Sequence, residues 1–430
     1  MTRFKRRLWI GASLFVLVLM GFGGWFYFVA FAKLEAALHR AEAFSFRRMI
    51  VTQLTEQGVY RFFYVTNRRS EFNDGPIEER FGTEREGVLK FGSFDAEIKP
   101  TLGIGMIINP TEWFQNEEIR LKSVRTLDQT VFVQQMRKLV QESPLRSLLV
   151  VVHGFREAFP SALRKTVFLS HVLDINTPVL LFDWPGDQGT SLRGYRRARR
   201  VAGASGAELA ATLKIAIREI QPDRLWLVAN SMGAQVVADA FSLLYQESDL
   251  ADADTEIEDV ILTAPDVGHE EFDQRFKEEI KALANHLTAY VSSNDRALLM
   301  SRLVNWERRR GESTLSPDML EEAAQVADLI EPGDQLITLV DVTPVNRTRN
   351  FHNFSLETPE FFDDLFLRLT DPDTPQSRPL YQVKTPDGTI YWVPDPQPIV
   401  RGRVWVRSVP EVLATRVAVS SPSRPPLRPA

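Results

Sequence analysis

The chain of 430 residues contains no cysteine. Disulfide bonds, thiolate catalysis and cysteine-ligated metal sites are therefore excluded. The six histidines show no metal-binding spacing such as H-E-x-x-H, so we expect no metal and no cofactor. A phosphate-binding P-loop is also absent, and Gly103-Ile-Gly105 lacks the third glycine and the following helix of a dinucleotide fingerprint. Nucleotide-dependent chemistry is not indicated.

An excess of positive charge is also missing. The chain has 51 Lys and Arg against 56 Asp and Glu, a formal net charge of −5. Without a basic field, the class of nucleic-acid-binding proteins is not favoured, and we expect no nucleic-acid partner. Hydrophobic residues make up 44 % of the chain, which is enough to build a large buried core.

One long uncharged stretch lies at the N-terminus. Residues 8–32 carry no charge, and roughly 20 apolar residues suffice to cross a bilayer as a helix. A short basic tail, residues 1–7, precedes this stretch, so the positive-inside rule predicts that the rest of the chain lies across the membrane from the cytoplasm. The alternative is a cleaved signal peptide, because Ala30-Phe-Ala32 resembles a cleavage site. The length of the stretch and the interfacial residues Trp25 and Tyr27 favour a retained anchor.

The remainder divides into three parts. Residues 33–57 form a predicted helical stalk, residues 58–370 a single domain, and residues 371–430 a proline-rich extension with a hairpin at Tyr381 to Val393 and a disordered tail. Strands are predicted at 59–66, 88–91 and 102–108 in the first part of the domain. Further strand-length apolar runs lie at 148–152, 179–182, 225–229, 260–263, 287–291 and 336–340, with amphipathic helices between them. Unbroken apolar strands are buried on both faces, which predicts a mostly parallel, doubly wound α/β sheet flanked by helices.

The segment around Ser231 carries the strongest functional signal. The apolar run 225–229 stops at Asn230-Ser-Met-Gly233, and a helical pattern follows at once. A strand that turns sharply into a helix would place the Ser231 hydroxyl on the bend, in front of the positive end of the helix. Ala229 and Gly233 take the places of the two glycines in G-x-S-x-G. The simpler interpretation is a serine that caps a helix after a buried strand.

Other reactive side chains follow neighbouring strands. In open α/β sheets, functional residues gather at the carboxyl ends of the strands. The backbone amides of Phe155, after His153-Gly154, and of Met232 are candidate oxyanion donors. Asp295 is the candidate acid of a Ser-His-Asp triad, and Asp266, one strand earlier, is held in reserve. His352 is the candidate base, with a buried structural histidine as the alternative.

Several strings occur together and in order. They are Phe62-Phe-Tyr-Val-Thr-Asn-Arg68, Val151-Val-His-Gly-Phe155, Phe182-Asp-Trp-Pro185, Asn230-Ser-Met-Gly-Ala234, Ala264-Pro-Asp266 and Ser292-Ser-Asn-Asp-Arg-Ala-Leu298. Over most of residues 59–370 the chain resembles a bacterial α/β-hydrolase family of unknown function that is lipase- and esterase-like. The resemblance implies Ser231 as nucleophile, Asp295 as acid and His352 as base.

One position departs from the family pattern, and one of the shared strings has no evident role. Asn230 replaces the histidine that the family usually has before the nucleophile, which we expect to tune activity without abolishing it. Thr66-Asn-Arg68 has no role that the residues themselves reveal, and its simplest interpretation is a structural turn with Arg68 paired to a carboxylate.

Together these features predict an α/β-hydrolase fold behind a transmembrane helix. The expected activity is hydrolysis of carboxylic esters, lipid-like esters among them, through an acyl-enzyme on Ser231. The expected location is the bacterial inner membrane with the domain on the periplasmic side. The alternative function is a non-catalytic envelope binding or scaffold protein of the same fold.

Overall fold

The computed structural model describes residues 49–54, 58–71, 75–99, 119–247, 257–267, 276–292, 337–346, 354–370, 380–384 and 390–394. Within these ranges, eleven strands form one sheet in the order β10-β11-β9-β8-β7-β6-β4-β5-β1-β2-β3. The strands are β1 (Val59–Ser70), β2 (Phe81–Ile98), β3 (Ile119–Leu127), β4 (Ser147–Val152), β5 (Val179–Asp183), β6 (Arg224–Asn230), β7 (Ile257–Thr263), β8 (Ala284–Val291), β9 (Ile337–Asp341), β10 (Leu380–Lys384) and β11 (Ile390–Pro394).

The centre of the sheet is parallel and its edges are antiparallel. Each neighbouring pair from β1 through β5, β4, β6, β7, β8 and β9 to β11 runs in parallel. The edge pairs β1–β2, β2–β3 and β10–β11 are antiparallel. This arrangement confirms the predicted mostly parallel sheet.

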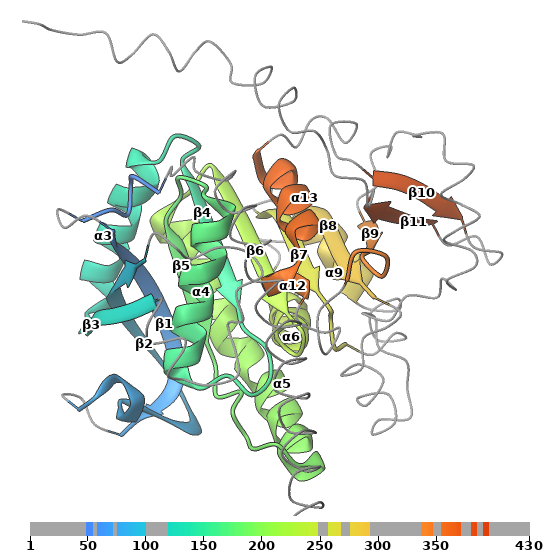
Figure 1. The fold of residues 1–430 in the computed structure, drawn as a ribbon. Helices are drawn as coiled ribbons and strands as arrows, with labels where there is room; N and C mark the ends of the chain where they lie inside the picture. The colour runs from blue at the N-terminus through green and yellow to red at the C-terminus, as the bar shows by residue number, and fades with distance from the viewer. Residues whose placement is uncertain are drawn as a thin grey trace, which may run out of the picture. The chain divides into compact units, whose positions relative to one another are not determined.

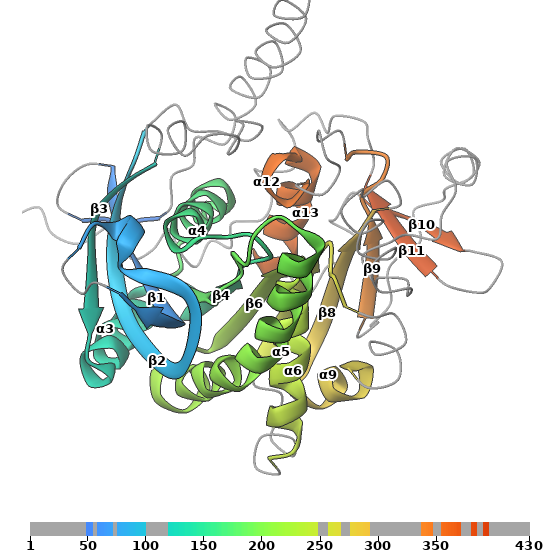
Figure 2. The same cartoon turned by 90° about the horizontal axis from the view of Figure 1, so that it is seen from below.

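Helices cover both faces of the sheet (Figures 1 and 2). One face carries α3 (Gln129–Glu142), α5 (Leu192–Ile215), which continues into the π-helical turn η2 (Ala216–Ile220), α6 (Gly233–Tyr245) and α9 (Lys277–Leu283). The other carries α4 (Phe159–Leu173), α12 (Phe354–Glu357) and α13 (Pro359–Thr370). The 3-10 turn η1 (Ile77–Glu79) lies between β1 and β2.

The strands supply both cores because successive side chains of a strand point to opposite faces. In β6, Leu225, Leu227 and Ala229 join the core beneath α5 and α6, whereas Trp226 and Val228 join the core beneath α4 and α13. A strand that is buried on both sides has to be apolar at every position. The uninterrupted runs in the sequence therefore located these strands to within a few residues.

The two strands at the N-terminal edge are longer than their apolar patterns predict. β1 does not end before Asn67 but continues to Ser70, and β2 spans 18 residues where only 88–91 were expected. Asn67 and Arg68 remain in the strand because buried partners satisfy their polar groups, which a hydrophobicity pattern cannot register. The predicted strand at 102–108 lies outside the described residues.

Both ends of the predicted domain differ from expectation. Where the predicted stalk is described, residues 49–54 form turns, and Gln53 bridges to Tyr60. The predicted hairpin is present, and it extends the sheet because Trp392 of β11 pairs with Val340 of β9. The sheet therefore continues beyond residue 370. The predicted anchor at 8–32 lies outside the described residues, and no helix of the described part is both long and apolar enough to cross a membrane.

The order of the strands reverses between β4 and β6. From β4 the chain passes to β5 on one side, and it then returns to place β6 on the other side. At such a switch point the loops after the two strands diverge and leave a crevice at the carboxyl ends, where ligands bind in this type of sheet. The loop after β4 begins at His153, and the turn after β6 contains Ser231.

Candidate active site

Ser231 lies at a strained turn between strand and helix. β6 ends at Asn230, α6 begins at Gly233, and Ser231 between them has a φ of +52°. A side chain in this left-handed region is unfavourable, so such a residue persists only where its surroundings hold it. Two hydrogen bonds do so: the Ser231 N–H donates to the Thr263 carbonyl (2.8 Å), and the Asp266 N–H donates to the Ser231 carbonyl (3.1 Å). The predicted sharp turn is confirmed.

Two glycines allow the backbones around Ser231 to approach closely. A Cβ at Gly154 would lie 3.0 Å from the Asn230 carbonyl oxygen and 3.1 Å from the Ser231 Cβ. A Cβ at Gly233 would lie 2.7 Å from the His153 carbonyl oxygen, too close for any real contact. The start of α6 and the loop after β4 therefore pack backbone to backbone, as a nucleophile elbow requires.

The two predicted oxyanion donors flank this turn. Phe155 follows Gly154, and Met232 follows Ser231 directly at the N-terminal end of α6. Among the described residues, neither backbone N–H has a hydrogen-bond acceptor. Backbone N–H groups at the N-terminus of a helix lie at the positive end of the helix dipole and can stabilise a developing negative charge.

Asp266, the reserve acid, lies beside the serine but has a partner of its own. Its backbone is bonded to Ser231, and its carboxylate accepts a hydrogen bond from the Tyr195 hydroxyl at 2.8 Å. Tyr195 is on the first turn of α5, and its ring meets the Phe155 ring edge to face at 5.7 Å. Tyr195 therefore links the Asp266 carboxylate to the Phe155 ring.

Asn230 links the turn to α12. Its side-chain amide donates to the Thr263 hydroxyl (2.9 Å) and to the Ser355 hydroxyl (3.1 Å). Ser355 is three positions after His352 in the sequence. The predicted base His352 and the predicted acid Asp295 both lie outside the described residues, so their roles remain predictions.

His153 is not available as an alternative base, although it is close. Its Nδ1 contacts the Gly154 carbonyl at 2.9 Å, and its Nε2 lies 3.1 Å from both Asp183 Oδ1 and the Trp184 amide nitrogen. Both ring nitrogens are therefore occupied, and the ring stacks on the Trp184 indole with 5.5 Å between centroids. No nitrogen is left to accept a proton from Ser231.

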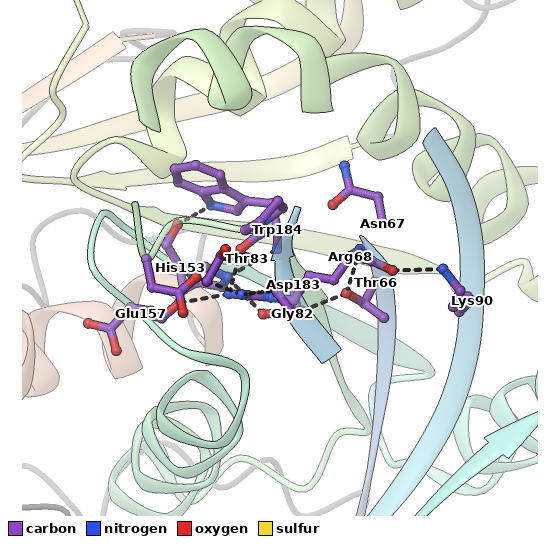
Figure 3. Close-up of polar contacts among 12 residues, drawn as sticks. Thr66, Asn67, Arg68, Gly82, Thr83, Lys90, His153, Glu157, Asp183 and Trp184 are labelled. Atoms are coloured by element: carbon purple, nitrogen blue, oxygen red, sulfur yellow. Dashed lines mark hydrogen bonds and ion pairs between the residues drawn. The ribbon is translucent and has the colours of Figure 1, made fainter. Parts of the chain in front are cut away.

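Arg68 occupies the centre of a buried polar network next to this loop (Figure 3). Its side chain is completely buried, and its guanidinium has five N–H groups, which matches the number of hydrogen bonds it makes. The acceptors are Asp183 Oδ2 (2.8 Å), Asp187 Oδ1 (2.7 Å), and the carbonyl oxygens of Gly82 (3.1 Å), Glu157 (2.7 Å) and Trp184 (2.8 Å). The expected pairing of Arg68 with a carboxylate is confirmed, but the expected turn at residues 66–68 is wrong, because this segment is part of β1.

Asp183 is the buried counter-charge of this network. Its Oδ2 also accepts from the Thr66 hydroxyl at 2.6 Å, and its Oδ1 faces His153. Burial on its own would raise the pKa of Asp183, but the charge of Arg68 and the bonds from His153 and Thr66 outweigh burial and lower the pKa. Asp183 is therefore ionised in the folded protein.

The sequence contained a signal for this network that the periodicity did not use. Arg68 lies within β1 and Asp183 ends β5, and a charged residue in an otherwise buried strand indicates a paired charge because an unpaired one is costly to bury. Within the described ranges, no group of three His, Asp or Glu side chains could hold a metal ion.

The parallel sheet, its covering helices and the serine at a strained strand-to-helix turn define the class of α/β hydrolases. The chain belongs to the family described as alpha/beta hydrolase of unknown function (DUF900), whose model matches residues 128–365, more than half of the chain. It is also similar to a solved lipase-esterase related protein from Clostridium acetobutylicum, with 13 % identity, 38 % of this chain and 82 % of that chain covered, and a TM-score of 0.21. No match was found among curated proteins.

Proposed function

We propose that this α/β hydrolase is a serine hydrolase that cleaves carboxylic esters. Ser231 is the nucleophile, His352 the general base and Asp295 the acid that orients the imidazole. The backbone amides of Phe155 and Met232 form the oxyanion hole. The observation that carries the proposal is the left-handed backbone of Ser231, with a φ of +52°.

That backbone conformation favours a catalytic serine over a helix cap. A capping serine normally has an extended backbone, which costs nothing. At Ser231 the chain instead holds a non-glycine residue in an unfavourable region, next to two glycines that allow close packing. Strain of this kind concentrates at functional sites, where it presents a side chain in a fixed direction.

In the first half of the reaction, the Ser231 hydroxyl attacks the ester carbonyl. His352 accepts the hydroxyl proton, and the carbonyl oxygen becomes an oxyanion that the two backbone N–H groups stabilise. The bond between the carbonyl carbon and the alcohol oxygen then breaks, and the alcohol leaves with the proton from His352. The acyl group remains on the Ser231 oxygen as an ester.

In the second half, water takes the place of the alcohol. His352 removes a proton from the water, the resulting tetrahedral species collapses, and the carboxylic acid is released as the proton returns to the Ser231 oxygen. Atoms balance without any cofactor, because each ester consumes one water and yields one acid and one alcohol.

The contacts of Asn230 support the assignment of the base. Ser355 is hydrogen-bonded to Asn230, the neighbour of Ser231, and a chain of three residues spans at most about 11 Å. The covalent chain thus limits how far His352 can be from this turn. The three described histidines give no competing candidate: His153 is fully engaged, His171 lies on α4, and His286 pairs in register with Asp259, far from the carboxyl end of β7.

The decisive experiment is covalent labelling of Ser231. The purified protein, solubilised in detergent, is incubated with a fluorophosphonate probe, which reacts with activated serines, and the adduct is mapped by mass spectrometry. We expect one adduct on Ser231 and hydrolysis of a short-chain aryl ester. Ser231→Ala should abolish the adduct and lower turnover by about a millionfold. Ser242→Ala is the matched control, because that buried serine donates to Glu279 away from the turn.

The same experiment tests the alternative function. A folded protein that forms no adduct on Ser231 and leaves short- and long-chain esters intact would contradict the hydrolase proposal. The non-catalytic binding or scaffold function would then take its place.

We also propose that residues 8–32 anchor this domain in the bacterial inner membrane, on the periplasmic side. An anchored hydrolase meets amphiphilic substrates at the bilayer, which suits lipid-like esters. The full chain should stay with membranes after alkaline carbonate washing, and added protease should cleave the domain in spheroplasts. Release of the full chain by carbonate, or protection from protease until the membrane is broken, would contradict the anchor or its orientation respectively.

A further inference from the structure

The loop that carries the proposed oxyanion donor Phe155 is itself strained. The next residue, Arg156, has a φ of +67°, in the region that disfavours a side chain. Nothing in the local sequence favours this conformation, since the loop His153-Gly-Phe-Arg-Glu157 has its only glycine two positions earlier. The loop must therefore be held in place from outside.

Three hydrogen bonds hold it, and they come from two other segments. The Trp184 indole N–H donates to the His153 carbonyl (2.8 Å), the Arg156 N–H donates to the Gly186 carbonyl (2.9 Å), and an Arg68 N–H donates to the Glu157 carbonyl (2.7 Å). The bonds lie before, immediately after and two positions after Phe155. The Phe155 amide therefore lies in the stretch of loop between these bonds.

Arg68 is the group that connects these supports. Besides Glu157, it bonds Asp183, the last residue of β5, and the Trp184 carbonyl directly after it (Figure 3). It also bonds Asp187, further along the segment after β5. The Asp183 carboxylate in turn faces His153, the first residue of the loop. One guanidinium thus fixes the supporting segment and one end of the loop at the same time.

We propose that Arg68 is a positioning residue for the hydrolytic reaction. By fixing the loop 153–157 against the segment after β5, it holds the Phe155 amide where the oxyanion forms. The inference rests on the proposed function and adds to it a completely buried residue on β1, which acts through the loop 153–157. It also gives the Thr66-Asn-Arg68 string a role in catalysis.

The chemistry explains why an arginine is required. A planar guanidinium offers five donors in fixed directions, so it can bind two carboxylates and three carbonyls without moving. A lysine keeps the charge but has only three donors on a flexible chain, and it cannot satisfy all five acceptors. The loop would then lose part of its support. Because an oxyanion donor acts only in the transition state, its displacement lowers kcat more than it changes KM.

The first test compares Arg68→Lys with Arg368→Lys in the full-length protein. Arg368 also forms a buried pair with Asp259 (2.7 Å), and Asp259 lies four residues before the end of β7, about 13 Å from the serine turn. Both variants weaken a buried arginine–aspartate pair, so Arg368→Lys controls for the loss of stability that either substitution causes. Fluorophosphonate titration counts the competent Ser231 in each sample, and kcat is expressed per labelled serine.

We expect Arg68→Lys to lower kcat per labelled Ser231 by at least about tenfold, with KM within about twofold of wild type. Loss of a complete oxyanion donor lowers kcat by about a hundredfold to a thousandfold, so a displaced donor should lower kcat by less than that. Arg368→Lys should leave kcat per labelled serine unchanged. Hydrogen exchange should also become faster in the peptide covering 153–157 for Arg68→Lys alone, a local change that a general loss of stability does not produce.

A second pair covers the case in which Arg68→Lys does not fold. Trp184→Phe removes the indole N–H bond to the His153 carbonyl while keeping every charge and an aromatic ring beside His153. Trp226→Phe removes an equally buried indole whose N–H donates to Glu258 at 2.7 Å, away from the loop. The first should lower kcat per labelled serine and the second should not.

The two proposals fail in different ways. If wild type neither labels at Ser231 nor hydrolyses an ester, the hydrolase function is wrong and this role falls with it. If wild type is active while Arg68→Lys or Trp184→Phe matches its control in kcat and in hydrogen exchange, only the positioning role is overturned.

Discussion

Gly154 and Ser231 are so close that a Cβ on the glycine would lie 3.1 Å from the Cβ of the serine. The same added atom would lie 3.0 Å from the Asn230 carbonyl oxygen, which belongs to strand β6 and cannot move away alone. The close approach therefore links the loop of the proposed oxyanion donor to the turn of the proposed nucleophile.

Gly154→Ala should separate these two groups by a few tenths of an ångström. We expect ester turnover to fall by about tenfold to a hundredfold, because small displacements of catalytic groups have large effects on rate. The kinetics are compared with those of Gly203→Ala. A Cβ at Gly203, within α5, meets only a side-chain oxygen of Asp239 at 3.3 Å, and alanine favours the helix by about 1 kcal/mol. Equal turnover in the two variants would show that the close approach has no catalytic value.

Asp295 and Asp266 are the two candidates for the acid of the triad, and substituting each by asparagine distinguishes them. Asp295→Asn should lower kcat by about ten thousandfold, because the imidazole is then held in the wrong tautomer. Asp266→Asn should lower it by less than about tenfold, since its carboxylate already accepts the Tyr195 hydroxyl. Tyr195→Phe, which removes that hydroxyl alone, serves as the control. The reverse order of the two asparagine variants would transfer the acid to Asp266.

The parallel core could be predicted from the sequence because burial on both faces leaves a mark at every position. In β4 all six residues are buried, and the apolar run 148–152 locates the strand to within one residue. The turn at Ser231 was predictable for a related reason. Strand, small residues and helix follow one another within ten positions, so the whole feature is local in the sequence.

The network around Arg68 could not be predicted in the same way. Its partners Gly82, Glu157 and Asp183 come from three segments that only the fold brings together. A hydrophobicity pattern treats Asn67 and Arg68 as the end of a strand, since it registers polarity and not the satisfaction of polar groups. The exposed residues 83–87 of β2 were not predicted as a strand, because no periodic burial marks them.

The ionisation of Asp183 makes stability depend on pH in a defined direction. Burial opposes the charge, but Arg68, His153 and Thr66 favour it and hold the pKa below its usual value of about 3.9. Since the pKa in the unfolded chain is higher, the unfolded state takes up the proton first as pH falls. The stabilisation is complete above about pH 4 and is lost as the pH drops through the folded-state pKa.

Urea unfolding between pH 7 and pH 3 measures this effect. Wild type should lose free energy of unfolding below about pH 4. Asp183→Asn should be less stable by about 3–5 kcal/mol at neutral pH, because Arg68 loses its completely buried counter-charge, and its stability should fall less steeply in acid. Asp187→Asn removes the partly exposed partner of the same arginine and should keep the steep acid dependence, since Asp183 still titrates. An equally steep dependence in Asp183→Asn would assign the acid sensitivity to other groups.

The bond between Asn230 and Ser355 offers a test of how the segment near the proposed base is held. The Asn230 amide donates to Ser355 at 3.1 Å and so fixes the start of α12 to the end of β6. One hydrogen bond of this kind contributes about 0.5–1.5 kcal/mol, which corresponds to about twofold to tenfold in rate if it positions His352. Ser355→Ala should lower kcat by that factor, while Ser231 in every molecule should still react with fluorophosphonate.

A double-mutant cycle separates this bond from the other effects of each residue. Asn230→Ala also loses the bond to the Thr263 hydroxyl, and it should therefore lower kcat further than Ser355→Ala. Once Asn230 is alanine, the Ser355 hydroxyl has lost its donor from β6. Adding Ser355→Ala should then change kcat by less than about twofold. Fully additive losses would mean that the two residues act independently, and the link from the serine turn to the segment after His352 would then have no part in catalysis.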